Sequence, residues 1–335
     1  MNTSFLPLLS DAFLRAHFDA EAKAFQGSTD EQSLLVRLRA WAARGRQTEM
    51  QAEAGFLKTF FFDTWAYWAD GTEGPEGGFT AFPRFPVTGA GAGGNQGVAD
   101  LALGWFHHPQ VPGTPQVVCE FKDVKSNLDA PQRRKGNTRS PVKQCADYLR
   151  GADLPLFGNQ PIQPRFGIVT DMNEFRIYWR DKMPAQYQRF IIRQQTGNTE
   201  PSLLDETPKG TFQRFLFSWL FRPDMLLSKT GEPPLLALIR AQLVQEKEVE
   251  RAFYVEYRRY REVLIDLLIA ANPNFPHSKG RLVRLAQKLL DRMIFVLFCE
   301  DMGQQIAYPP QLLRDRPRRL SEQDLSPDGD DAWEI

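Results

Sequence analysis

Two apolar runs separated by a Pro/Gly-rich turn constrain the fold of this chain more than any other feature of the sequence. The first run, Val98 to Phe106, carries Asp100, and the second, Gln116 to Lys122, carries Glu120 near its end. Runs of this length on either side of turn residues predict a β-hairpin. Because side chains alternate between the two faces of a strand, Glu120 and Lys122 are expected to point to the same side.

The three charged residues are the groups that metal-assisted hydrolysis of a phosphodiester needs at one edge of a sheet. Asp100 and Glu120 would supply oxygen ligands to Mg²⁺, with Mn²⁺ as the expected substitute. A bound ion of this kind makes hydroxide available near neutral pH and offsets charge in the transition state. Lys122 would orient or deprotonate the attacking water or stabilise developing negative charge, and the sequence leaves these roles open.

The same acid–x–lysine pattern recurs one register later, at Asp123 and Lys125. Glu120 and Lys122 are preferred because they end the apolar strand, whereas the second pair falls in its polar exit.

A predicted helix that begins after Thr48 and ends before Gly71 carries two further acids, Glu49 and Glu53, one turn apart. By themselves these acids are expected to be solvated surface residues. The alternative is that one of them reaches the metal site.

The segment after the hairpin is the most basic part of the chain. Because the chain has 41 basic and 41 acidic residues, any surface for a polyanion must be local. Positive charge beside the candidate site would follow a phosphate backbone, although a solvated loop is an equally good interpretation of any single residue. The candidate DNA-binding residues are Lys125, Arg133, Arg134, Lys135, Arg139 and Lys143.

The order of elements predicts an α/β domain with a mixed sheet. A helix starts at Ser140-Pro141, and two strands, Arg165 to Thr170 and Glu174 to Trp179, follow it. The chain becomes mainly helical near Thr211.

Three distant cysteines without a Cys/His cluster argue against a zinc site or disulfides and favour a reducing, cytoplasmic setting. No apolar stretch is long enough to predict a membrane span.

Four segments in this order resemble the N-terminal nuclease module of type IIG and type IIL restriction–modification enzymes and of related phage-defence methylases. They are GVADLALG, VVCEFKDVKSNLD, SPVKQCADYLRGA and FGIVTDMNEFRIYW. That module belongs to the PD-(D/E)xK superfamily, so the resemblance implies a restriction-endonuclease-like mixed sheet flanked by helices. It also implies double-stranded DNA as substrate, a prokaryotic cytoplasm, and Asp100, Glu120 and Lys122 as the nuclease triad.

The resemblance implies roles for further residues. Gln144 and Tyr148 match the QxxxY helix that supports many such sites. A glutamate on an early helix commonly completes the metal site in these enzymes, and Glu53 is favoured over Glu49 for this position.

The resemblance covers roughly residues 45 to 300, and RMIFVLFCEDMG resembles the last helix of the connector that follows the nuclease module. The predicted organisation is a helical cap (1–46), a nuclease domain (47–195), a linker (196–210), an all-α connector (211–308) and a polar tail (309–335) that leads to a missing methyltransferase region. The chain lacks an NPPY loop and a Gly-rich S-adenosylmethionine loop, so this cofactor is not expected.

The methyltransferase and target-recognition region would lie in the same longer polypeptide or in a partner subunit, and dimerisation during cleavage stays open. The sequence therefore predicts a Mg²⁺-dependent DNA endonuclease module. The alternative is a catalytically inactive PD-(D/E)xK-like DNA-binding or assembly module that docks a DNA adenine methyltransferase.

Overall fold

The computed structural model describes residues 6–44, 48–72, 74, 77–87, 96–111, 113–124, 126–132, 138–151, 164–194, 201–274 and 278–302. Four of the predicted DNA-binding residues, Lys125, Arg133, Arg134 and Lys135, lie outside these ranges, as does the predicted tail (309–335). The chain divides into two compact units, Met1–Val244 and Gln245–Ile335.

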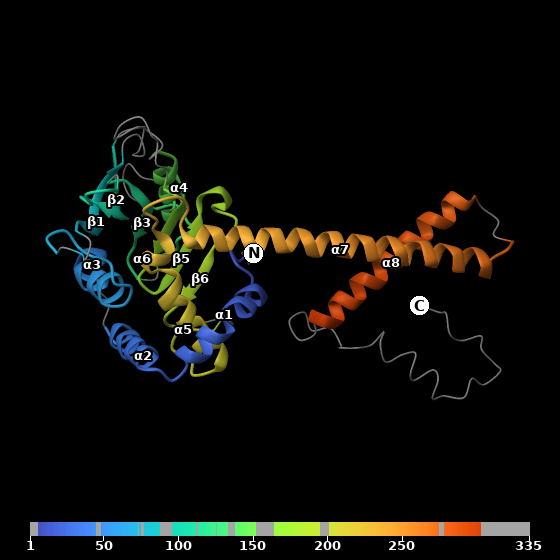
Figure 1. Ribbon diagram of the computed structural model, residues 1–335, viewed down its shortest axis with the longest axis horizontal. Helices are drawn as coiled ribbons and strands as arrows, with labels where there is room; N and C mark the ends of the chain where they lie inside the picture. Colours follow the sequence, from blue (N-terminus) through green and yellow to red (C-terminus); the bar gives the residue numbers. More distant parts are fainter. Residues whose placement is uncertain are drawn as a thin grey trace. The chain divides into compact units, whose positions relative to one another are not determined.

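The first unit is built on a six-stranded mixed sheet whose strands lie side by side in sequence order (Figure 1). Neighbouring strands are antiparallel except β3 and β4, which are parallel and connected through helix α4 (Pro141–Gly151). This arrangement confirms the predicted α/β class with a mixed sheet. The strands are β1 (Phe79–Val87), β2 (Gly97–Phe106), β3 (Pro115–Phe121), β4 (Phe166–Thr170), β5 (Glu174–Trp179) and β6 (Gln188–Ile191).

The sheet separates two apolar cores. The larger core joins the sheet to α1 (Asp11–Phe25), α2 (Thr29–Ala42), α3 (Glu49–Phe56), the π-helical turn η1 (Leu57–Phe62) and α5 (Pro208–Leu220). The smaller core joins it to α4, which packs closely because β4 carries Gly167: a Cβ atom there would lie 2.7 Å from the Cys145 Sγ. The sheet is therefore the middle layer, with several helices on one face and α4 on the other.

In the region predicted as a helical cap (1–46), the first helix begins only at Asp11. Ser10 adopts an extended conformation and caps the helix, because its side chain accepts a hydrogen bond from the Phe13 N–H. The preceding residues lie beside the residues that lead into β6, and the Leu8 N–H donates a hydrogen bond to the Tyr187 carbonyl at 3.2 Å. The apolar residues before Ser10 therefore pack without forming a helix.

The predicted helix from residue 48 to residue 70 also ends early, at Phe62. Its last turn widens into π-helical hydrogen bonding, and Ala66 then takes a positive φ of 61°. This turn directs Trp65 into the larger core, where its Nε1 donates to the Phe217 carbonyl at 3.0 Å. Burial of a large aromatic side chain outweighs continuation of the helix.

Helices α5 and α6 (Pro223–Leu226) belong to the first unit, although the sequence places them in or beside the predicted connector. Arg214 on α5 is buried, and its guanidinium donates to Glu31 Oε1 on α2 at 2.7 Å. The same guanidinium also donates to the Leu203 and Asp205 carbonyls. Residues just after the polar stretch at 196–210 are thus tied to the N-terminal helices.

The second unit contains most of the 38-residue helix α7 (Pro234–Ala271) and helix α8 (Lys279–Met302) (Figure 1). A hydrogen bond of 2.7 Å from the Tyr257 hydroxyl to Asp291 Oδ1 joins the two helices. Within the described ranges, no helix is long and apolar enough to cross a membrane.

We expect Glu31→Ala to lower the free energy of unfolding by about 3–5 kcal/mol, because it leaves the buried Arg214 guanidinium without its carboxylate. Glu206→Ala is the matched control, since it removes an exposed pair with Arg39 (2.7 Å) and should cost at most about 1 kcal/mol. Urea denaturation measures both variants. Similar losses of unfolding free energy in the two variants would contradict a stabilising buried ion pair between α2 and α5.

Candidate active site

Asp100 on β2 and Glu120 on β3 lie next to each other in the sheet. The register pairs Leu101 with Cys119, which places Asp100 beside Glu120 one step further along. The Phe121 N–H donates to Asp100 Oδ2 at 2.7 Å and so fixes this carboxylate against the neighbouring strand. Cys119 and Phe121 point into the larger core, which agrees with the predicted alternation of faces.

Lys122 follows β3 directly and is buried with the two acids. Its backbone N–H donates to the Thr170 carbonyl at 2.9 Å, which extends the contact between β3 and β4. Its Nζ donates to Glu120 Oε1 and, at 2.5 Å, to the Phe121 carbonyl. The structure therefore brings Asp100, Glu120 and Lys122 together.

Glu120 is the most deeply buried of the three, at 1% exposure. Burial, together with the charge of Asp100, raises the pKa of Glu120 to about 8, although Lys122 acts in the opposite direction. Burial lowers the pKa of Lys122, but the charges of Glu120 and Asp100 outweigh this effect and the net shift is upward. The Lys122 ammonium therefore stays charged, while burial makes the Glu120 carboxyl harder to ionise.

Helix α3 brings both predicted glutamates to this group. Glu53 Oε2 lies 2.5 Å from Nη2 of Arg84, whose Nη1 is 3.4 Å from Asp100 Oδ1. Glu49 Oε2 lies 4.0 Å from the Nζ of Lys122. Because their side chains are only 17% and 15% exposed, Glu49 and Glu53 are not the solvated surface acids that the sequence alone favours.

Asp123, the acid of the alternative acid–x–lysine pattern, contacts the backbone of α3. Its Oδ1 accepts a hydrogen bond from the backbone N–H of Glu49, the first residue of α3. Asp123 therefore anchors the N-terminus of the helix that carries Glu53, a position where a carboxylate is stabilised by unpaired N–H groups.

Gln144 and Tyr148 on α4 support the strand that carries Asp100. Gln144 Nε2 donates to the Tyr148 hydroxyl at 2.7 Å, and this hydroxyl donates to the Val98 carbonyl at 2.9 Å. Val98 precedes Asp100 by two residues, so the contact holds the start of β2 against α4. The pair acts on the backbone of β2 through these hydrogen bonds.

The two predicted DNA-binding residues that the structure describes, Arg139 and Lys143, lie together around one carboxylate. Arg139 Nη1 and Lys143 Nζ are 3.1 and 2.9 Å from the two oxygens of Asp147 on α4. Arg150 approaches the same carboxylate at 3.5 Å. Three cations share one anion, which leaves this face of α4 with net positive charge.

The arrangement fits a divalent cation in part. Glu120 Oε2 is buried without a hydrogen-bond partner among the described residues, and the carboxylate of Asp100 lies beside it. Glu53 is joined to this pair only through Arg84. Accordingly, no three His, Cys, Asp or Glu side chains within the described ranges gather as a ready metal-binding group.

Arg84 is the residue of this site that the motifs do not indicate. It lies on β1 in the segment PRFPV, and its role depends on cross-strand register and on a positive φ of 57°. A single arginine between prolines carries no local signal of this contact.

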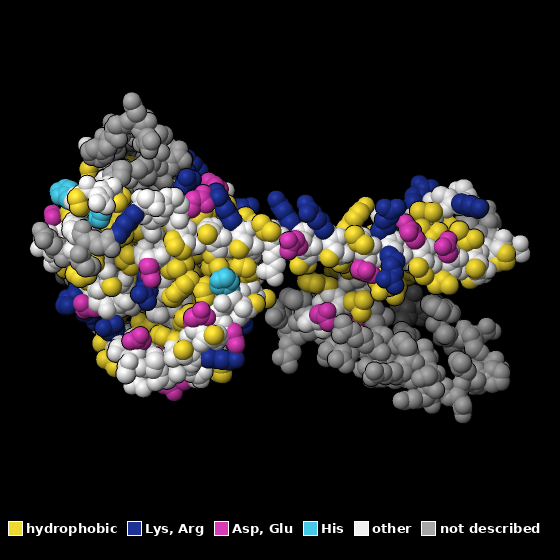
Figure 2. Space-filling view, viewed as in Figure 1, with side chains coloured by type: hydrophobic (Ala, Val, Ile, Leu, Met, Phe, Trp, Pro, Cys, Tyr) yellow, Lys and Arg dark blue, Asp and Glu magenta, His cyan; other side chains and the backbone are white. Residues whose placement is uncertain are grey.

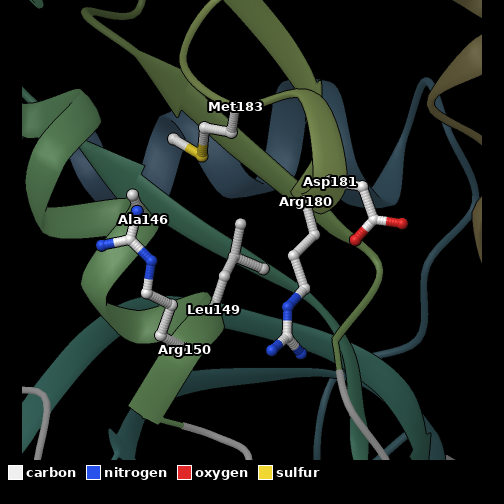
Figure 3. Close-up of a pocket in the computed structure, with 6 residues that line it drawn as sticks. All are labelled: Ala146, Leu149, Arg150, Arg180, Asp181 and Met183. Atoms are coloured by element: carbon white, nitrogen blue, oxygen red, sulfur yellow. The ribbon is translucent and has the colours of Figure 1, made fainter.

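A pocket of about 440 Å³ lies apart from the acidic group. Figure 3 shows Arg150 and Arg180 reaching from α4 and from the short helix η3 (Arg180–Lys182), with Leu149 between them. Its remaining lining residues are Ala146, Asp181 and Met183. None of the triad residues lines this pocket, so it is separate from the candidate active site.

No protein-family model, curated protein or solved structure matches the chain.

In protein free of divalent cations, Glu120→Gln should remove a pH-dependent loss of stability. Glu120 binds its proton more tightly in the folded chain (pKa about 8) than in an unfolded one (about 4.3), so folding takes up a proton between these values. The protonated Glu120 contributes fully to the free energy of unfolding below about pH 4.3. This contribution is lost as pH rises towards 8, and the total loss is at most about 5 kcal/mol.

The difference in unfolding free energy between Glu120→Gln and wild type should therefore grow with pH across this window and level off above it. Urea denaturation from pH 5 to pH 9 measures the difference, with Glu206→Gln as an exposed control. Parallel pH profiles for wild type and Glu120→Gln would show that the folded pKa of Glu120 is not raised.

Proposed function

We propose that this chain is a Mg²⁺-dependent DNA endonuclease module of a prokaryotic restriction–modification or phage-defence system, with a PD-(D/E)xK domain followed by an all-α connector. The observation that carries the proposal is the convergence of Asp100, Glu120 and Lys122 at the end of β3. Two adjacent carboxylates with a buried ammonium against one of them are unusual in a core, because burying charge is costly. Perturbed groups of this kind cluster at functional sites.

The residues that would hold the metal are Asp100, Glu120 and Glu53. Glu120 offers the buried oxygen that has no hydrogen-bond partner among the described residues, and the Phe121 N–H keeps Asp100 oriented beside it. When bound, Mg²⁺ supplies Lewis-acid activation of water and offsets phosphate charge.

Lys122 is placed to act on the reacting phosphate and water as a hydrogen-bond donor. Its Nζ has three protons and is held by Glu120 Oε1 and the Phe121 carbonyl. The remaining donor capacity would orient the attacking water or stabilise charge that develops on the phosphate oxygens. Gln144 and Tyr148 would keep β2 in register with this donor through the Val98 carbonyl.

The DNA backbone would be held by the basic face of α4. Arg139 and Lys143 supply positive charge there, and Lys143 is 54% exposed. Contacts of this kind position a duplex without reading its sequence. Base recognition would come from a methyltransferase and target-recognition region in the same polypeptide or in a partner subunit, with dimerisation during cleavage as a further option.

A second candidate function is that of a catalytically inactive DNA-binding or assembly module that docks a DNA adenine methyltransferase. The second unit favours it, because large apolar side chains lie exposed on both of its helices (Figure 2). Exposed apolar patches commonly mark interaction sites. The exposed residues include Phe253, Val263, Leu267, Leu289, Phe295 and Phe298.

Cutting of supercoiled plasmid DNA in the presence of Mg²⁺ separates the two functions. We expect wild type to nick the plasmid and Lys122→Ala to lose about 10²-fold or more of this rate, the usual effect of removing one transition-state donor. Lys58→Ala is the matched control, since it removes an exposed lysine paired with Asp63 and should cut normally. Failure of wild type to cut with any divalent metal, with or without an added methyltransferase subunit, would exclude the endonuclease.

Metal binding is tested by Glu120→Ala. Calorimetric titration with Mn²⁺ or Ca²⁺ should detect binding to wild type and none to the variant, because the variant loses the central ligand. Circular dichroism should show that Glu120→Ala stays folded, and Glu206→Ala serves as the exposed control. Unchanged affinity in Glu120→Ala would place the metal site elsewhere.

A further inference from the structure

The guanidinium of Arg84 lies on the acidic group of the candidate active site. Its Nη2 is 2.5 Å from Glu53 Oε2, and its Nη1 is 3.4 Å from Asp100 Oδ1. Two carboxylates from different elements, α3 and β2, therefore share one cation. These are two of the three carboxylates that the proposed function assigns to the metal.

The backbone of β1 directs this side chain to the site. Pro83 pairs with Leu101 and Phe85 with Ala99, which places Arg84 opposite Asp100. Arg84 has a φ of 57°, in the left-handed region that residues with a Cβ atom avoid. Strained conformations of this kind persist where the surrounding structure holds them, and they cluster at functional sites.

Arg84 and Lys122 differ in how easily they can leave the acids. The Arg84 side chain is 53% exposed, whereas that of Lys122 is 8% exposed. Moving Lys122 away would leave the Glu120 carboxylate buried without its cation, at a large cost. Arg84 can instead turn into solvent, where its charge is well hydrated.

A divalent cation bound at Glu53 and Asp100 would compete with Arg84 for the negative charge of the same two carboxylates. A guanidinium stays charged at any pH a protein tolerates, so it also repels an incoming cation. The two cations therefore compete, and the affinity measured for the metal includes the cost of displacing Arg84.

We infer that Arg84 is a displaceable counter-cation of this site, which holds Glu53 and Asp100 together in the metal-free protein and leaves these oxygens when a divalent cation binds. This inference rests on the proposed function and makes Arg84 a positioning residue that sets metal affinity. It gives the site two states, one closed by arginine and one occupied by metal.

Calorimetric titration of the full chain with Mn²⁺ tests the exchange. Arg84→Gln removes the competing charge and keeps much of the side chain, so it should bind Mn²⁺ about tenfold more tightly than wild type, within the usual range of coupling between two ligands. Arg84→Lys restores a cation and should return affinity towards wild type. Arg39→Gln, which removes a comparably exposed arginine paired with Glu206, should leave affinity unchanged.

Arg84→Gly separates the effect of charge from that of backbone strain. Glycine tolerates a positive φ and also lacks the guanidinium, so this variant should bind Mn²⁺ at least as tightly as Arg84→Gln. Equal or weaker binding in both Arg84→Gln and Arg84→Gly than in wild type would overturn the exchange while leaving the nuclease intact. Absence of Mn²⁺ binding in wild type and in every variant would overturn the proposed function as well.

Discussion

The first unit depends on one costly arrangement: a carboxylate with almost no contact with water, beside a second carboxylate and a buried ammonium. In a medium of low polarity, such a group persists only if its surroundings hold it in place. Three hydrogen bonds fix the elements that surround it. The Phe121 N–H holds Asp100, the Val98 carbonyl ties β2 to Tyr148, and Asp123 holds the start of α3. The helices around the sheet thus act as supports for a site that the sheet alone would not maintain.

Much of the central sheet could be predicted from the sequence, because alternation and turn residues are local signals. The strands carrying Asp100 and Glu120 and the helix after Pro141 all lie where these signals place them. The convergence of Glu120 and Lys122 follows from the two-residue period of a strand. Arg84 could not be found in this way, because its contact depends on the pairing of β1 with β2 and on an unusual backbone conformation.

The ends of helices were less predictable, since they are decided by packing at a distance. Trp65 leaves the expected helix because its indole finds a carbonyl on α5, 152 residues later in the chain. Arg214 similarly joins α5 to α2 across a polar stretch that looks like a boundary between domains. Polarity in a sequence marks exposure of a loop, but it does not say which core the next helix enters.

The hydrogen bond from Tyr148 to Val98 has a consequence for how the acidic site forms during folding. Asp100 and Phe121 are separated by 21 residues and belong to one hairpin, so they can meet early. The bond from Tyr148 closes 50 residues, and its helix α4 lies in the connection between the parallel strands β3 and β4. Because contacts that close longer loops form more slowly, Asp100 and Glu120 would come together before Tyr148 fixes the start of β2.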